Sequence, residues 1–131
     1  MDRRKFLKAI AGMCGTAALP ANIFRRQQKV YLLRCYVRGF CFYEGGELLL
    51  RMRKGDALQL VREPQNTFDS NAIALYYQNR KIGFIPRESN DVISKLMDDG
   101  TLHIKAEITR VRPDAGSWER VQTAIYLVKD G

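Results

Sequence analysis

After residue 30, apolar and polar residues alternate through most of the chain. Six segments combine this alternation with β-branched and aromatic residues, a composition that favours strands. The predicted strands span residues 30–38, 57–62, 72–77, 81–85, 102–112 and 120–128. Residues 78–80 are short and polar enough to join the third and fourth strands as a hairpin. The pattern therefore predicts a mostly β domain over residues 30–131.

One segment has a helical period instead. Its apolar residues recur at i, i+1, i+4 and i+5, namely Val92, Ile93, Leu96 and Met97. Ser89 stands where an N-cap is expected, and Gly100 stands at the C-terminal position that favours glycine. Residues 47–53 are open to interpretation as a helical turn. Six strands with one or two short helices predict a small six-stranded barrel, OB-like or SH3-like, or a strongly curved sheet.

The first thirty residues have a different character. A basic start is followed by about a dozen mildly apolar residues and then by small residues, the order of an export leader. The residues Arg3, Arg4, Phe6, Leu7 and Lys8 resemble the twin-arginine export signal. The resemblance implies that residues 1–21 are a signal, that Arg3 and Arg4 engage the twin-arginine export machinery, and that residues 22–29 are a basic linker.

A functional leader places the domain outside the cytoplasm, in the periplasm. The alternatives are an uncleaved anchor that holds the domain on the inner face of the membrane, a basic amphipathic helix lying on a membrane, and a solvated tail of a cytoplasmic protein. No stretch approaches the ~18 uninterrupted apolar residues of an ordinary membrane-spanning helix.

The net charge of +8 is distributed unevenly. Residues 1–29 contain seven Lys/Arg against one Asp, a charge of +6, and residues 30–131 contain fifteen Lys/Arg against thirteen Asp/Glu, a charge of +2. The total charge is therefore no argument that the domain binds nucleic acid. Such an argument must rest on where the individual charges lie in the folded domain.

Signatures of metal binding and catalysis are missing from the sequence. The three cysteines (Cys14, Cys35 and Cys41) and the single His103 have no zinc-ligand spacing, and no nucleophile–base pair or phosphate-cradling glycine loop is recognisable. Cys35 and Cys41 form a disulfide only if the fold brings their Cα atoms within ~7 Å. We expect no metal, no cofactor and no enzymatic activity.

The loop over residues 63–71 has the most distinctive composition. An aromatic residue, Phe68, directly precedes Asp69, with Asn71 two residues later and Asn66 before them. Such Asx side chains bond nearby backbone amides and fix loops, which would hold Phe68 outward as a platform. The alternative is that Phe68 belongs to the core at the barrel end and that Asp69 and Asn71 only stabilise the loop.

Two motifs in this region resemble the HIRAN domain. They are the run Asn66-x-Phe68-Asp69-x-Asn71-Ala72-Ile73 and the run Ile82-Gly83-Phe84-Ile85-Pro86, in this order. The resemblance extends from about Val30 to Val128. It implies an OB-like barrel that grips single-stranded DNA, in some members at a 3′-hydroxyl end.

The resemblance also implies roles for individual residues. Asp69 and Asn66 would read the terminal nucleotide, aromatic side chains would stack on bases, and a basic residue at the start of the helix would meet phosphate. Carried onto this sequence, the candidate nucleic-acid-binding residues are Phe42, Asn66, Phe68, Asp69, Arg87 and Trp118.

One departure from the family pattern bears on DNA binding. The DNA-end-binding members have an arginine at the position of Cys41, so this chain loses one phosphate contact. The leader favours an alternative function, an exported periplasmic domain that binds a protein partner or another ligand and has lost DNA-end recognition. The loop residues favour DNA, and the two indications remain in conflict at the level of sequence.

Overall fold

A computed structural model describes residues 27–40 and 43–130, within which Lys29–Lys129 form one compact unit. The described part contains six strands, two α-helices and three 3₁₀ turns: β1 (Gln27–Tyr36), α2 (Gly45–Leu48), η3 (Leu49–Arg51), β2 (Ala57–Arg62), β3 (Ile73–Tyr77), β4 (Arg80–Phe84), η4 (Arg87–Ser89), α3 (Asn90–Asp99), β5 (His103–Val111), η5 (Ser117–Glu119) and β6 (Val121–Asp130). The predicted strands are confirmed, with ends shifted by a few residues, and α2 with η3 confirms the helical turn.

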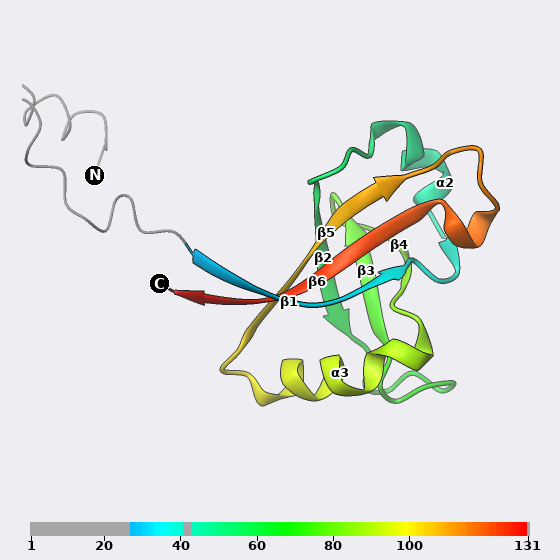
Figure 1. Cartoon of the computed structure of the whole chain (residues 1–131). Coiled ribbons are helices and arrows are strands. Elements are labelled where there is room, and N and C mark those ends of the chain that lie inside the picture. The colour runs from blue at the N-terminus through cyan, green and yellow to red at the C-terminus, as the bar shows by residue number, and fades with distance from the viewer. Residues whose placement is uncertain (1–26, 41–42, 131) are drawn as a thin grey trace, which may run out of the picture. The chain divides into compact units, whose positions relative to one another are not determined.

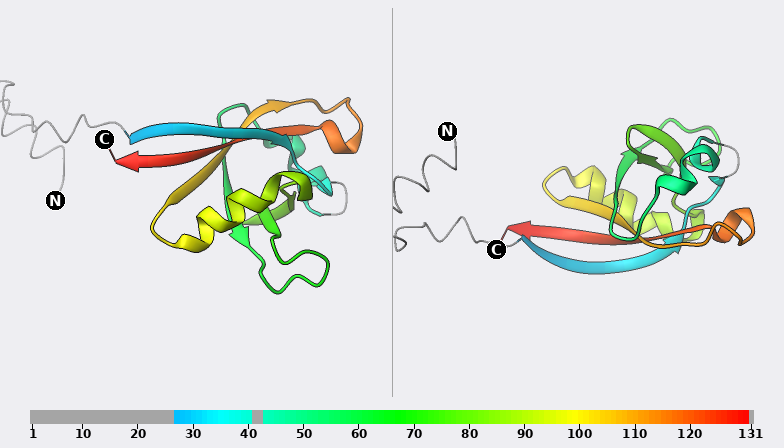
Figure 2. Two further views of the ribbon diagram at one scale, coloured as in Figure 1. Left: turned by 60° about the horizontal axis from the view of Figure 1, so that its bottom comes forward. Right: turned by 90° about the horizontal axis from the view of Figure 1, so that it is seen from above.

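The six strands form one sheet in the order β1-β6-β5-β2-β3-β4, with β1 and β6 side by side (Figures 1 and 2). The first two residues of β2 pair with β5 and the remaining four pair with β3, so β2 connects the two parts of the sheet. Beyond β1, Arg38 bridges to Phe84 of β4 through backbone hydrogen bonds of 2.8 and 2.9 Å. This bridge joins the two outer strands and closes the barrel.

Gly83 makes the closure sterically feasible. Its φ is +152°, and a Cβ at this position would lie 2.5 Å from the carbonyl oxygen of Arg38 and 2.6 Å from Cγ1 of Val37. Only glycine lets the two backbones approach this closely. The glycine of the Ile82-Gly83-Phe84 run therefore has a defined role in the fold.

The hairpin between β3 and β4 is tighter than the sequence predicts. Gln78 and Asn79 adopt φ values of 51° and 67°, so β4 begins at Arg80. Two consecutive positive φ values match the right-handed twist of paired strands. A register shift between Leu75 and Tyr76 bends the pair further.

The barrel interior is filled by large apolar side chains. The most deeply buried are Phe40, Leu48, Ile73, Leu75, Ile82, Ile85, Ile93, Ile108 and Ile125. α3 contributes Ile93 to this core and ends at Gly100, whose φ of +81° gives the predicted C-terminal cap. Ser89 occupies the N-cap position but makes no capping hydrogen bond with its side chain. No helix among the described residues is long and apolar enough to cross a membrane.

Candidate functional site

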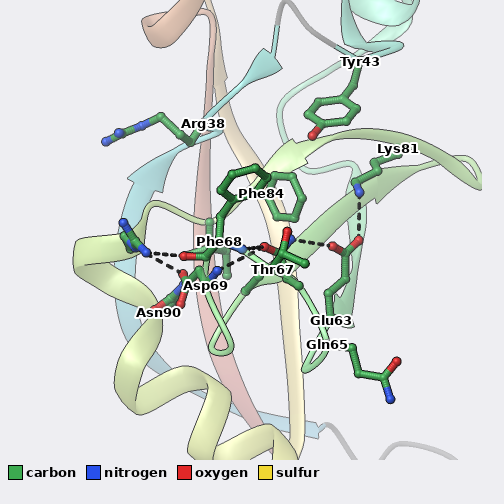
Figure 3. Close-up of a pocket in the computed structure, with 14 residues that line it drawn as sticks. Arg38, Tyr43, Glu63, Gln65, Thr67, Phe68, Asp69, Lys81, Phe84 and Asn90 are labelled. Carbon is green, nitrogen blue, oxygen red and sulfur yellow. Dashed lines mark hydrogen bonds and ion pairs between the residues drawn. The ribbon is translucent and has the colours of Figure 1, made fainter.

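A cleft of about 620 Å³ opens between the β2–β3 loop, β4 and the start of α3; we call it the loop cleft (Figure 3). Its lining residues come from segments that lie far apart in the sequence. They are Arg38, Tyr43, Glu63, Gln65, Asn66, Thr67, Phe68, Asp69, Ala72, Lys81, Phe84, Ile85, Arg87 and Asn90. Because barrel closure brings Arg38 beside Phe84, the loop cleft depends on the fold as a whole and not on the loop alone.

The β2–β3 loop is fixed by its own polar side chains. The side-chain oxygen of Asn66 accepts the backbone N–H groups of Phe68, at 2.9 Å, and of Asp69, at 3.1 Å. This is an Asx-type turn, as the sequence predicts. It leaves the Phe68 side chain 84% exposed, the most exposed large hydrophobic side chain among the described residues. The alternative in which Phe68 belongs to the core is therefore excluded.

Asp69 is held from both sides. Its Oδ1 accepts the backbone N–H of Asn71 at 2.9 Å, and its Oδ2 accepts Nδ2 of Asn90 at 2.8 Å. The hydrogen bonds from Asn90 and Asn71, and then the positive charge of Arg87 with its Nε 3.8 Å away, lower the pKa of Asp69 below its ordinary value. Asp69 is thus a carboxylate at neutral pH.

Lys81 connects the loop to the opposite side of the cleft. Its ammonium group lies 2.8 Å from Oε2 of Glu63, while Oε1 of Glu63 accepts the amide of Asn66 at 3.1 Å. The same ammonium group lies 4.4 Å from the ring centre of Phe84 and 5.0 Å from that of Tyr43, within cation–π range. Although partial burial opposes it, hydrogen bonding to Lys81 and Asn66 keeps the pKa of Glu63 below its usual value.

Two arginines bind other backbone and side-chain groups around the β2–β3 loop. Arg87 donates a hydrogen bond to the carbonyl oxygen of Phe68. Arg62 donates to the carbonyl oxygen of Ala72 at 2.8 Å and forms a bidentate pair with Asp98 near the end of α3. In Figures 1 and 2 the loop accordingly lies beside the first turn of α3. Helix and loop form one hydrogen-bonded unit.

The fold brings four of the six candidate binding residues together in the loop cleft. These are Asn66, Phe68, Asp69 and Arg87. Trp118 is exposed on η5, packs its indole against Gly116 and is not among the residues that line the loop cleft. Its role in binding stays a prediction.

Several candidates lie outside the described residues. They are Phe42, Cys41 and the leader with Arg3 and Arg4. Cys35 is buried, and burial raises the pKa of its thiol to about 12, so this thiol stays protonated at neutral pH. No group of three His, Cys, Asp or Glu side chains in the described ranges is arranged to hold a metal ion.

Other residues of the loop cleft were not singled out from the sequence. Arg38 reaches it through barrel closure, Lys81 through its pair with Glu63 and Tyr43 through its contact with Phe84. Asn90 is 2% exposed at the start of α3. A weak signal existed for Tyr43, which ends the aromatic run 40–43, and for Lys81, which begins the run leading to Pro86. A buried asparagine at a helix start has no signature in a single sequence.

Fold and site define a small β-barrel binding domain. The HIRAN domain family matches residues 30–130, and the chain belongs to this family. A crystal structure of a protein from Lactobacillus plantarum is similar over 79% of this chain and 99% of its own, with 24% identity and a TM-score of 0.68. The HIRAN domain of human HLTF is similar over 78% of this chain and 80% of its own, with 20% identity and a TM-score of 0.59. No curated protein matches the chain significantly.

At these identities the likeness to solved structures establishes the shared fold, a six-stranded antiparallel OB-like barrel with short helices. Family membership establishes the class of function. HIRAN domains are known as nucleic-acid-binding modules.

Proposed function

We propose that the loop cleft binds single-stranded DNA and takes up its 3′-hydroxyl end. The observation that carries the proposal is the arrangement of Phe68 and Asp69: an exposed aromatic ring held outward by Asn66, directly followed by a fixed carboxylate. Adjacent stacking and hydrogen-bonding groups suit a nucleotide, which offers a flat base and a polar sugar.

Phe68 supplies the stacking surface in this proposal. Its ring is 84% exposed at the loop cleft, so a base can cover it without displacing other side chains from the core. Stacking of a base on an aromatic side chain is worth about 1–3 kcal/mol and tolerates any base. Because the Asn66 turn holds the backbone of Phe68 in place, little backbone ordering is needed when the base arrives.

Asp69 supplies the discrimination between DNA ends. A carboxylate only accepts hydrogen bonds and has about four acceptor positions, of which Asn71 and Asn90 occupy two. Its side chain is 20% exposed and lines the cleft, so a further donor can reach it from there. A 3′-hydroxyl can donate to Asp69, whereas a 3′-phosphate would be repelled by the negative charge.

Arg87 supplies a phosphate contact. Its side chain is largely exposed and stands beside both Phe68 and Asp69, held by the Phe68 carbonyl group. A guanidinium group binds phosphate oxygens through two parallel hydrogen bonds. With the base on Phe68 and the hydroxyl at Asp69, the neighbouring phosphate would lie toward Arg87.

NMR chemical-shift mapping tests this assignment. On addition of a short single-stranded oligonucleotide, we expect the largest shifts at the amides of Asn66, Phe68, Asp69 and Arg87, and small shifts along β5 and β6. Shifts of Trp118 would confirm its predicted contact. An unchanged spectrum at low salt contradicts DNA binding, and shifts away from the loop cleft contradict its placement.

The leader favours a second candidate function, an exported domain for a protein or ligand partner. It rests on the match of Arg3, Arg4, Phe6, Leu7 and Lys8 to a twin-arginine signal. Cell fractionation distinguishes the cases. A periplasmic band shortened by roughly 20 residues supports export, a full-length membrane-bound band supports an anchor, and a full-length soluble band contradicts both.

A further inference from the structure

We propose that Arg38 is a second phosphate-binding residue of the loop cleft and that Glu88 occupies its guanidinium group until DNA binds. This inference rests on the proposed function and adds to it a residue outside the two recognised sequence motifs. Three observations carry it: the anchoring of Arg38, the distribution of charge in the cleft, and the exposure of the Arg38–Glu88 pair.

The backbone of Arg38 is fixed where the barrel closes. Its N–H and C=O groups each bond to Phe84, at 2.8 and 2.9 Å, and Phe84 itself lines the loop cleft. The side chain therefore extends from a backbone that is held by both of its polar groups. Figure 3 shows Arg38 at one end of the cleft, with Tyr43 and Lys81 at the other.

The lining of the loop cleft contains three cations, Arg38, Lys81 and Arg87, and two anions, Glu63 and Asp69. Lys81 is engaged, because its ammonium group lies 2.8 Å from Glu63 and both side chains are more than two-thirds buried. An incoming phosphate would have to break a partly buried pair to use Lys81. Arg87 and Arg38 are therefore the cations that remain accessible to a DNA backbone.

Arg38 has an exchangeable partner. Its guanidinium group lies 2.9 Å from Oε2 of Glu88, with side chains 56% and 66% exposed. Exposed pairs of this kind contribute ~0–1 kcal/mol, so a phosphate can displace Glu88 at small cost. Glu88 also follows Arg87 directly in the chain, on η4. The Arg38–Glu88 pair thus lies next in the chain to Arg87, and Glu88 is the acidic group that a phosphate has to displace from Arg38.

The test is a salt series of fluorescence anisotropy with the full chain and a labelled oligothymidine of about six nucleotides. We expect Arg38→Gln to weaken binding about 3- to 10-fold and to reduce the slope of log K against log salt by ~0.7, the value for one phosphate contact on a single strand. Arg34→Gln removes the same charge from an exposed site on β1 outside the cleft lining and is the matched control. Arg38→Lys should retain most of the slope.

Glu88→Gln tests the pairing. We expect it to strengthen binding about two- to fivefold in the wild-type background, as expected for an exposed pair, and to change nothing when Arg38 is already Gln. If Arg38→Gln and Arg34→Gln behave alike while the wild type binds, the role of Arg38 is overturned and DNA binding stands. If the Glu88→Gln gain persists without Arg38, the pairing is overturned. If the wild type fails to bind at low salt, this inference and the proposed function fall together.

Discussion

The side-chain amide of Asn90 donates a 2.8 Å hydrogen bond to Oδ2 of Asp69, across 21 residues of sequence. Asn90 is 2% exposed and begins α3, so the bond ties the β2–β3 loop to a packed helix. A polar group buried so deeply is costly unless it is paired. The position of the Asp69 carboxylate is therefore fixed by the core of the domain, although Asp69 belongs to a loop.

Replacement of Asn90 tests this connection. We expect Asn90→Ala to lower the free energy of unfolding by about 1–3 kcal/mol, because Asp69 loses a buried hydrogen bond. Urea denaturation measures the change. Asn71→Ala is the matched control, since its amide makes only a 3.4 Å exposed contact with Asp91; a loss below about 0.5 kcal/mol is expected there. Equal losses would contradict the structural role of Asn90.

The ionisation of Asp69 gives a pH dependence. The pKa of Asp69 is lower in the folded protein than its ordinary value, chiefly through Asn90 and then Asn71. Its stabilising contribution is complete above the unfolded pKa of about 3.9 and is lost as the pH falls through the lower folded pKa. The stability difference between wild type and Asp69→Asn should therefore be constant near neutrality and shrink in acid. A difference independent of pH would contradict this.

Barrel closure depends on the absence of a side chain at residue 83. Gly83→Ala places a Cβ against the backbone of Arg38 and the side chain of Val37, and we expect it to cost about 1–3 kcal/mol. Gly46→Ala is the control, because a methyl group at residue 46 would have no neighbouring atom within 4 Å. Urea denaturation compares the two variants. Equal stability of both would contradict the close approach of β4 to the backbone of Arg38.

The exposed ring of Phe68 should matter for binding and little for folding. We expect Phe68→Ala to weaken single-strand binding about 5- to 150-fold, the loss of one stacked base, with a change in stability below about 0.5 kcal/mol. Leu50→Ala removes a comparably exposed side chain outside the cleft lining. Fluorescence anisotropy should show no effect of that control. Unchanged binding by Phe68→Ala would remove the stacking role.

The strands, the hairpin and α3 follow from local pattern, and so does the outward position of Phe68, because Asn66 and Asp69 act on neighbouring backbone groups. The residues on the other side of the cleft cannot be predicted from the local sequence pattern. Arg38 and Lys81 join it through the bridge at Phe84 and the pair with Glu63, both of which connect residues far apart in sequence.

Trp118 illustrates the same limit. The place of its loop relative to the loop cleft depends on the order of strands in the sheet, in which β5 and β6 lie between β1 and β2. A single sequence contains no local signal for that order. The predicted contact of Trp118 with a ligand stays a prediction. The burial of Asn90 is likewise decided by how α3 packs on the barrel.

The central claim, uptake of a DNA end at Asp69, is tested most directly by comparing two labelled single strands that differ only in a 3′-hydroxyl or a 3′-phosphate. Anisotropy with the full chain should show tighter binding of the hydroxyl form, and Asp69→Asn should abolish the difference. Equal affinity of the wild type for the two strands would contradict end recognition, and binding of neither would contradict the DNA function of the loop cleft.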